Sequence, residues 1–458
     1  MPEPESKIAL IEDPYIRTED AIREPPVSFS GKFRQLGPGF ILSAAIVGSG
    51  ELIATTTLGA KAGFITFWVI LVSCLVKVTL QLEFGKHAIY SGETIMAAFN
   101  RLPGPRMGKA NWTIWTWLFI QLFKLLQVGG IIGGVAITLN IAFSFLPVPL
   151  WILIAAVSAA LLIYKGYYRT VEKICLLMIG LFTLLTFASL FSLQYTEYAL
   201  NWNQIASGLT FSLPPAAVGV AIAAFGITGV GGDEIMYYNY WCLEKGYARF
   251  TGPYRDTPEW ERRAKGWISV MHLDALFSMA VYTVVTAAFY LLGAAILHQR
   301  GNAPEGYQMI ETLSYIYTET LGPWAKSVYL LGALIVLYST LFAALASWTR
   351  IFSDAFGQLG WINFYHAETR RKSIAIMAWV FPLIWGILYL FIKLPVLMIL
   401  LGGFSTSILL LIVVYAAYQF RYHRVPPNLT PSRLYDIFLW ISGLMILAVG
   451  VYSITKVL

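Results

Sequence analysis

The hydrophobic residues of this chain gather in long runs that recur from Phe40 to the C-terminus. A helix needs about 20 mostly apolar residues to cross the hydrocarbon core of a bilayer. Eleven stretches are candidates, so the pattern predicts an all-α membrane protein with eleven transmembrane helices. These stretches, numbered here as spans 1 to 11, lie at residues 38–62, 64–86, 112–145, 149–164, 171–195, 214–242, 267–297, 323–352, 373–392, 395–418 and 434–455.

Two of the spans are interrupted by glycines followed by acid. Span 1 breaks at residues 48–51, which read Gly-Ser-Gly-Glu, and span 6 breaks at residues 229–234, which read Gly-Val-Gly-Gly-Asp-Glu. Carboxylates at membrane depth are costly, and irregular backbone persists there only where it is buried in protein or lines a cavity. Matching interruptions in two halves of a membrane protein indicate the substrate site of a secondary transporter.

The interruptions also divide the chain into two halves, spans 1–5 and spans 6–10. Five is an odd number, so the halves would cross the membrane in opposite orientations as an inverted repeat, with span 11 as an addition. The predicted divisions are a cytoplasmic tail at 1–35 and a transporter domain at 36–458, itself made of a first repeat at 36–196, a second repeat at 212–420 and a last helix at 430–458.

Composition agrees with a membrane protein and excludes a soluble one. The 458 residues are 57% hydrophobic and 12% charged, with a mean hydropathy of +0.65. The first 35 residues are polar and rich in proline, without the apolar core of a signal peptide, so we expect a partly disordered tail.

The net charge of +7 is explained by where the basic residues fall, and it does not suggest a nucleic-acid partner. Cytoplasmic loops of membrane proteins carry an excess of Lys and Arg. We therefore place the N-terminus in the cytoplasm and the C-terminus outside, in a bacterial inner or plasma membrane. Most of the 32 Lys and Arg residues lie in the tail and in loops at 86–109, 165–173, 245–265, 350–372 and 421–433.

No enzyme is expected, because the chain has no His-Glu-x-x-His, Walker loop or Gly-x-Ser-x-Gly sequence. Its three cysteines are too dispersed for a zinc site. We predict no cofactor and no obligatory protein partner; the expected partners are the lipid bilayer and a metal ion as substrate.

The segment that begins Gly37-Pro38-Gly39-Phe40 and continues to the first interruption resembles the first helix of the natural resistance-associated macrophage protein (NRAMP) family. That resemblance implies a LeuT-type 5+5 inverted repeat with helices 1 and 6 broken, and transport of divalent metal ions by alternating access. Residues 212–214 and 274–298 also look similar to the family. The likeness covers most of spans 1 to 10.

The chain departs from the family at the residues that bind metal. The family has Asp-Pro-Gly-Asn at the first break, where this chain has Gly48 and Glu51 in place of Asp and Asn. The family has Met-Pro-His-Asn at the second break, where residues 231–234 read Gly-Gly-Asp-Glu. Val128 and Ile131 stand where the family has acids for proton movement. The chain therefore resembles a divergent, NRAMP-related protein.

Replacing a thioether by carboxylates changes the metal that a site prefers. Thioethers favour softer transition metals, whereas carboxylates, carbonyls and water suit Mg²⁺, Ca²⁺ and Mn²⁺. The glycines widen the cavity, which suits Mg²⁺ because it keeps part of its hydration shell. We expect Mg²⁺ or Mn²⁺ rather than iron. The expected side-chain ligands are Glu51, Asp233, Glu234 and Thr228, with cavity backbone from Gly48, Ser49, Gly50, Gly229, Gly231 and Gly232.

Alternatives remain at this stage. Each acid lies where the second half of a broken helix begins. A helix N-terminus favours a carboxylate even without a bound ligand, so in one alternative the acids only cap these half-helices. In a second alternative the protein transports a different solute, and the acids bind an amine of that substrate or a co-transported cation. A non-transporting receptor or scaffold is a third possibility.

A milder break is expected at Gly402 and Gly403 in span 10. It would add polar atoms from residues 405–407 to the cavity.

Lys124 lies in the middle of span 3, where a lysine should pair, snorkel or lose its charge. One hypothesis is that it pairs with a break carboxylate and replaces a coupling ion. The other is that it snorkels or pairs with a distant residue such as Glu83.

Two further charged positions have simpler interpretations. Asp274 near the start of span 7 is expected to be a helix residue rather than a ligand. Glu83 and Lys86 have the spacing of a local ion pair.

Overall fold

The computed structural model describes residues 13–457 except 49, 166–167, 302 and 306–307. It is a helical bundle with one two-stranded hairpin. Its elements in chain order are η1 (Glu19–Ala21), α2 (Phe29–Phe33), α3 (Pro38–Ile46), η2 (Gly50–Thr55), α4 (Thr56–Ala62), η3 (Gly63–Thr66), α5 (Phe67–Ser91), α6 (Ile95–Asn100), β1 (Arg106–Met107), β2 (Ala110–Asn111), α7 (Trp112–Ala142), α8 (Val148–Ile163), α9 (Tyr168–Leu193), α10 (Trp202–Ser207), η4 (Pro215–Ala217), α11 (Val218–Ile227), α12 (Gly232–Lys245), α13 (Tyr247–Thr251), α14 (Pro258–Leu292), η5 (Gly293–Leu297), α15 (Met309–Leu321), α16 (Ala325–Gln358), α17 (Ala367–Ile392), α18 (Pro395–Gln419), η6 (Phe420–Arg424), η7 (Pro427–Leu429) and α19 (Arg433–Val457).

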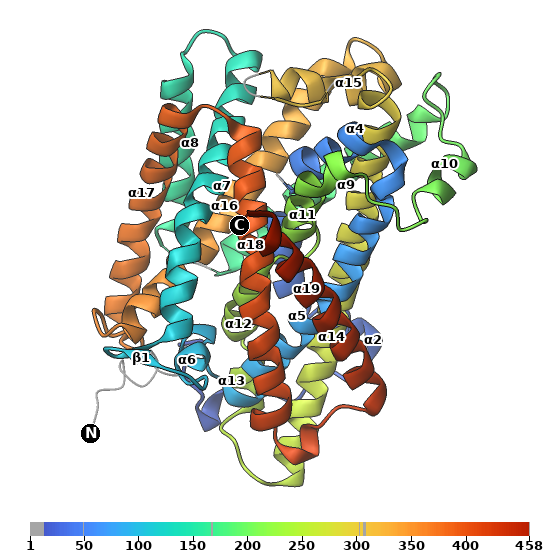
Figure 1. Ribbon diagram of the computed structural model, residues 1–458. Helices are drawn as coiled ribbons and strands as arrows, with labels where there is room; N and C mark the ends of the chain where they lie inside the picture. The colour runs from blue at the N-terminus through green and yellow to red at the C-terminus, as the bar shows by residue number, and fades with distance from the viewer. Residues whose placement is uncertain (1–12, 49, 166–167, 302, 306–307, 458) are drawn as a thin grey trace.

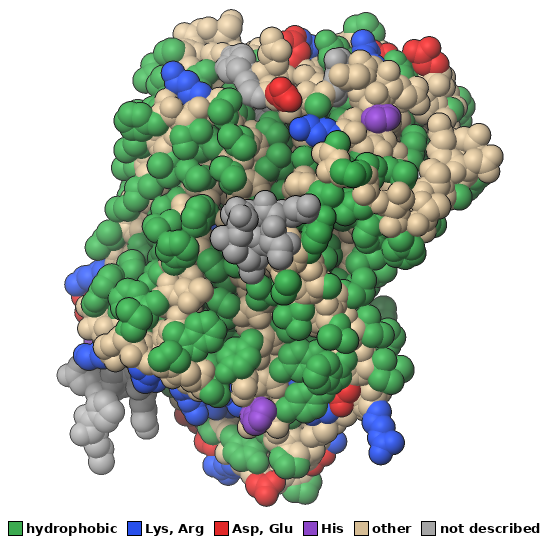
Figure 2. Space-filling model, viewed as in Figure 1, with side chains coloured by type: hydrophobic (Ala, Val, Ile, Leu, Met, Phe, Trp, Pro, Cys, Tyr) green, Lys and Arg blue, Asp and Glu red, His purple; other side chains and the backbone are tan. Residues whose placement is uncertain are grey.

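Helix occupies every one of the eleven ranges that the hydrophobic pattern predicts. By length and composition, eight helical stretches in the described part of the chain are able to cross a membrane. The predicted spans 1 and 2 fall within one of these stretches, Pro38–Ser91; α8 is shorter than a usual span, and α9 is not among the eight. The protein is therefore a predominantly helical membrane protein. Figure 2 shows hydrophobic side chains over the middle of one face, with charged side chains gathered toward its ends.

The arrangement of the helices brings distant segments together at each end of the bundle. β1, α6 and α13 lie at one end, and α4, α10 and α15 lie at the other (Figure 1). Between the ends, α7 packs against α16, α17 and α18, while α5 packs against α12 and α14. Loops predicted to share one side of the membrane, at 86–109 and 245–265, thus lie at the same end.

The helices that begin the two predicted halves both stop short and restart. α3 ends at Ile46 and η2 begins at Gly50, while α11 ends at Ile227 and α12 begins at Gly232. Gly229 has φ +63°, a left-handed conformation that suits glycine, and a Cβ there would lie 2.9 Å from the backbone of Cys74. Both interruptions are enclosed by other helices.

The milder break expected at Gly402 and Gly403 is wrong, because α18 runs unbroken through both glycines. Their role is close packing instead. A Cβ on Gly403 would lie 2.5 Å from the carbonyl oxygen of Ala223, and one on Gly402 would collide with Gln127. Small residues of this kind allow neighbouring helices in a membrane to approach closely.

The described part of the predicted N-terminal tail packs against the bundle. Asp13 forms a buried ion pair with Arg370 at 2.6 Å, and the hydroxyl of Tyr15 donates to Glu244 at 2.7 Å. The backbone of Arg23 bonds to Phe250. These partners lie far away in sequence. The tail has no apolar run, so the sequence pattern did not predict that it packs against the bundle.

Candidate functional site

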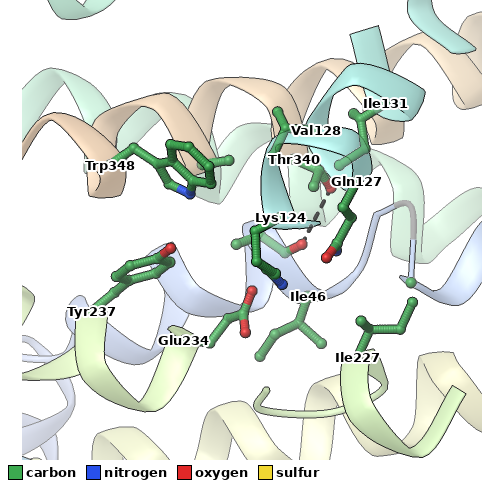
Figure 3. A pocket seen from close by; sticks show the side chains of 13 residues that line it. Ile46, Lys124, Gln127, Val128, Ile131, Ile227, Glu234, Tyr237, Thr340 and Trp348 are labelled. Atoms are coloured by element: carbon green, nitrogen blue, oxygen red, sulfur yellow. Dashed lines mark hydrogen bonds between the residues drawn. The ribbon is translucent and has the colours of Figure 1, made fainter. Parts of the chain in front are cut away.

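A small cavity of about 30 Å³ lies beside the two interruptions. Figure 3 shows its labelled side chains converging from several helices. α7, α12 and α16 supply the polar and aromatic ones, and the ends of α3 and α11 supply apolar ones. The lining residues are Ala45, Ile46, Gly50, Lys124, Gln127, Val128, Ile131, Ile227, Glu234, Tyr237, Thr340, Ala344 and Trp348.

Lys124 on α7 links the cavity to the second interruption. Its Nζ lies 3.2 Å from Oδ2 of Asp233 and donates to the hydroxyl of Thr406 on α18 at 2.7 Å. Gln121, one turn earlier on α7, donates to Oδ1 of Asp233 at 2.8 Å. Lys124 and Asp233 are both buried. The predicted pairing of Lys124 with a break carboxylate is confirmed, whereas its role in coupling stays a prediction.

Glu234 is the carboxylate that faces the cavity. In Figure 3 its carboxylate and the Lys124 ammonium point toward each other, with the amide end of Gln127 beside them. A Cβ on Gly231 would collide with Oε2 of Glu234. The absence of a side chain at Gly231 therefore makes room for this carboxylate.

The Glu51 carboxylate closes the first interruption from within. It accepts hydrogen bonds from the hydroxyl of Thr286 on α14 at 3.0 Å and from the backbone N–H of Gly48 at 3.3 Å. Glu51 is fully buried and is not among the residues that line the cavity. This arrangement matches the capping alternative, in which the acid satisfies free N–H groups at a helix restart.

Thr228 and the carbonyls near it already have partners. The Thr228 hydroxyl donates to the carbonyl of Ala224 at 2.7 Å, and its own carbonyl accepts from Ser73 and from Nζ of Lys77. The carbonyl of Gly48 accepts from the backbone of Leu52 at 2.9 Å. The carbonyls of Gly48 and Thr228 are therefore occupied by hydrogen bonds within the protein.

The structure thus separates the four residues expected to bind metal. Glu234 lines the cavity, Asp233 lies behind it with Lys124, and Glu51 and Thr228 hold the backbone of the two interruptions. Among the described residues, no group of three His, Cys, Asp or Glu side chains is placed to hold a metal ion. Gly50 lines the cavity, Gly232 starts α12 against Leu409, and Ser49 lies outside the described residues.

Two polar residues of the cavity were missed by sequence reasoning. Gln127 has a buried side-chain oxygen without a hydrogen-bond partner among the described residues, and Thr340 donates to the carbonyl of Ala45 at 3.2 Å. Gln121, Lys124 and Gln127 recur every three residues, which places them on one face of a helix. That spacing was a usable signal, whereas nothing in the sequence marks Thr340.

Three other expectations have clear outcomes. Glu83 and Lys86 form the predicted local ion pair at 2.7 Å, so Glu83 is not the partner of Lys124. Asp274 accepts from the backbone N–H groups of Gly37 and Gly39 at the start of α3, which is a structural role. Val128 and Ile131 line the cavity with apolar side chains.

Comparison with known proteins identifies the relatives of this chain. The sequence profile described as natural resistance-associated macrophage protein-like matches residues 39–456. The chain is 24% identical to an uncharacterized protein of Pasteurella multocida over 73% of each chain. It is 26% identical to the divalent metal cation transporters MntH of Brucella suis and Mycobacterium tuberculosis, covering 62% and 65% of this chain. It spans 60% and 65% of the length of these two transporters.

Solved structures share the fold. A manganese transporter of Eremococcus coleocola superimposes with a TM-score of 0.64 at 15% identity, covering 96% of this chain and 91% of that one. A nucleobase-cation-symport-1 family transporter gives a TM-score of 0.58 at 14% identity, covering 92% and 93%. The fold is therefore of the LeuT type. The relatives with a named function are transporters rather than enzymes.

Proposed function

The chain belongs to the natural resistance-associated macrophage protein-like family, and from this we propose that it is a secondary transporter that moves divalent metal ions by alternating access. The MntH relatives are named as divalent metal cation transporters, and the Eremococcus coleocola protein as a manganese transporter. Those names support the class of substrate, and the chemistry of the cavity supports the site.

The cavity beside the second interruption carries the proposal. A free volume of about 30 Å³ suits an ion or one or two waters, since one water needs roughly 10–15 Å³. The atoms in it that are able to bind a metal ion are oxygens, namely those of the Glu234 carboxylate and the side-chain oxygen of Gln127, which has no hydrogen-bond partner among the described residues. A cavity of this size with an anionic oxygen ligand favours a small cation.

We infer a preference for Mg²⁺ or Mn²⁺ over Fe²⁺. No methionine, cysteine or histidine is among the residues that line the cavity, and oxygen-only sites suit hard cations. In this proposal Glu234 is the ligand that remains from the four expected. Asp233 joins it when Lys124 withdraws, while Glu51 and Thr228 hold the two interruptions.

Lys124 would compete with the metal ion in the proposed cycle. Its ammonium balances Asp233 and faces Glu234. A divalent ion that enters the cavity would compete with this ammonium for the same carboxylates. Binding therefore requires Lys124 to move toward another acceptor, such as Thr406, to which it already donates.

We also propose the full topology. Eleven transmembrane helices would form two inverted repeats at 36–196 and 212–420 plus a last helix at 430–458, with helices 1 and 6 broken. The distribution of Lys and Arg supports a cytoplasmic N-terminus and an outside C-terminus. The bacterial relatives support an inner or plasma membrane location.

Uptake in proteoliposomes tests the function. The parent protein should take up Mn²⁺ or Mg²⁺ saturably, and Glu234→Gln should lower uptake about 100-fold, the effect of losing roughly 2.7 kcal/mol of ligand binding. Glu311→Gln, at an exposed glutamate paired with Lys326, is the matched control and should match the parent. Absence of saturable uptake of any divalent ion by the folded parent protein would overturn the proposal.

One observation favours a second candidate, a transporter of a small zwitterionic solute. The cavity holds both a cation and an anion, Lys124 and Glu234, together with the rings of Tyr237 and Trp348. The free volume is too small for such a solute in this conformation, so the cavity would have to widen. Saturable uptake of an amino acid without uptake of divalent ions would favour this candidate.

A further inference from the structure

The second lysine in the core, Lys77 on α5, is not explained by the proposed metal site. Its Nζ donates to the carbonyl oxygens of Phe225 and Thr228, each at 2.6 Å, at the end of α11. The side chain is fully buried. It is absent from the lining of the cavity, so it is separate from Glu234 and Lys124.

A buried ammonium normally needs a carboxylate, and within the described residues Lys77 has none at ion-pair distance. Taking an unpaired charge out of water is costly unless other groups replace its hydration. Here the replacement is the negative end of the α11 helix dipole, and the ring of Phe225 lies 5.1 Å from Nζ.

The carbonyls that hold Lys77 form a prepared receptor for positive charge. Ser73, one turn before Lys77 on α5, donates to the same two carbonyls at 3.0 and 2.9 Å. The left-handed turn at Gly229 follows directly and packs closely against Cys74 of α5. In broken-helix transporters, unwound carbonyls and half-helix C-termini are the groups that coordinate coupling cations.

We propose that Lys77 is a tethered cation that permanently occupies a monovalent-cation site at the C-terminus of α11. The ammonium supplies the charge and the hydrogen bonds that a bound Na⁺ or K⁺ would otherwise supply. The interruption of α11 is therefore stable without any bound monovalent ion, and the protein needs none for folding or for transport.

The parent protein gives the first test, by its melting temperature in detergent with the ionic strength held constant. NaCl, KCl and choline chloride should give the same melting temperature, and none should act saturably. A saturable rise specific to Na⁺ or K⁺ would overturn the proposal, because the site would then bind a free cation beside the lysine.

Lys77→Met gives the second test, because it keeps the length of the side chain and removes the ammonium. We expect its melting temperature to fall by about 5–10 °C, since two buried carbonyls lose the charged one of their two side-chain donors and keep only the Ser73 hydroxyl. Ethylammonium or Na⁺ should restore stability in proportion to the logarithm of its concentration, as binding to the folded state requires. Lys326→Met, at an exposed lysine on α16, should show neither the loss nor the rescue.

Either of two results with Lys77→Met would overturn the proposal. One is a melting temperature equal to that of the parent, and the other is a loss that no cation restores. If Lys77→Met does not fold, the measurement on the parent protein still decides. Both tests read stability rather than uptake, so their failure is distinct from failure of the proposed metal transport.

Discussion

The two interrupted segments look alike in sequence, but their acids have different partners in the structure. Each has glycines followed by acid. At the first, Glu51 bonds to Gly48 within its own segment and to Thr286 on α14. At the second, Asp233 meets Lys124 from α7, and Glu234 faces the cavity.

The difference lies in which helix faces each interruption. On α14 the first acid, Glu51, meets a neutral hydroxyl, so its carboxylate only accepts hydrogen bonds from this hydroxyl and from the backbone. α7 offers a cation and two amides, Gln121 and Gln127, to the second pair of acids. A glycine-and-acid interruption therefore indicates broken helix, while its neighbours decide whether the acid holds backbone or presents charge to a cavity.

Removing the lysine at the second interruption should have the largest effect. Lys124→Met leaves Asp233 and Glu234 buried without their cation, and breaking a buried pair on one side costs about 3–5 kcal/mol. Unfolding in detergent measures this loss. Adding Asp233→Asn to Lys124→Met should recover most of it, because one of the two charges is then removed. Equal stability of Lys124→Met and the parent would contradict the pairing.

Truncating the acid at the first interruption should cost stability and spare transport. Glu51→Ala leaves a void and strands the donors of Gly48 and Thr286, for a loss of about 2–4 kcal/mol. The KM for the metal ion, measured in proteoliposomes with the protein kept below its melting temperature, should stay within about threefold of the parent, or less than 0.7 kcal/mol. A KM raised by two orders of magnitude would assign Glu51 to the site instead.

A methyl group at Gly231 should act on the site rather than on the fold. Its Cβ would collide with Glu234 and push the carboxylate out of place. We expect Gly231→Ala to weaken metal binding about tenfold, equal to 1.4 kcal/mol, as measured by calorimetry. The matched control is Gly219→Ala on α11, where a Cβ would have no neighbour within 4 Å. Parent-like binding by Gly231→Ala would show that the glycine is not needed for Glu234.

Removing the hydroxyl that holds Glu51 should cost less stability than truncating Glu51 itself. Thr286→Val preserves the shape of the side chain and removes one hydrogen bond to a carboxyl group, at a cost of about 1.5–3 kcal/mol. Thermal unfolding of the two proteins side by side measures this cost. Thr340→Val, which loses only a 3.2 Å bond to the carbonyl of Ala45, should cost about 0.5–1.5 kcal/mol. The order of these two losses, rather than either alone, tests the contrast between the segments.

Much of the fold was predictable because membrane helices leave a strong pattern. The eleven apolar ranges all contain helix, and both interruptions coincide with the places where α3 and α11 end. The unbroken course of α18 was not predictable from Gly402 and Gly403, since glycines serve close packing as well as breaks. The packing of residues 13–23 against the bundle depends on single long-range pairs such as Asp13 with Arg370.

The site was only partly predictable, because the roles of identical side chains depend on partners far away in sequence. The sequence singled out Glu51, Asp233 and Glu234 together, and the structure divides them between two tasks. Lys124 was predictable as a partner because a lysine at that depth needs one. Lys77 was equally visible in span 2, but the carbonyls that hold it belong to α11 and leave no mark in the sequence.

We propose that the second interruption forms the ion site and that the first supports the backbone. Calorimetric binding of Mn²⁺ to Glu51→Gln and Glu234→Gln, prepared side by side and both shown to be folded, tests it most directly. We expect the affinity of Glu51→Gln to stay within about threefold of the parent and that of Glu234→Gln to fall about 100-fold. Loss of binding in Glu51→Gln with parent-like binding in Glu234→Gln would contradict it.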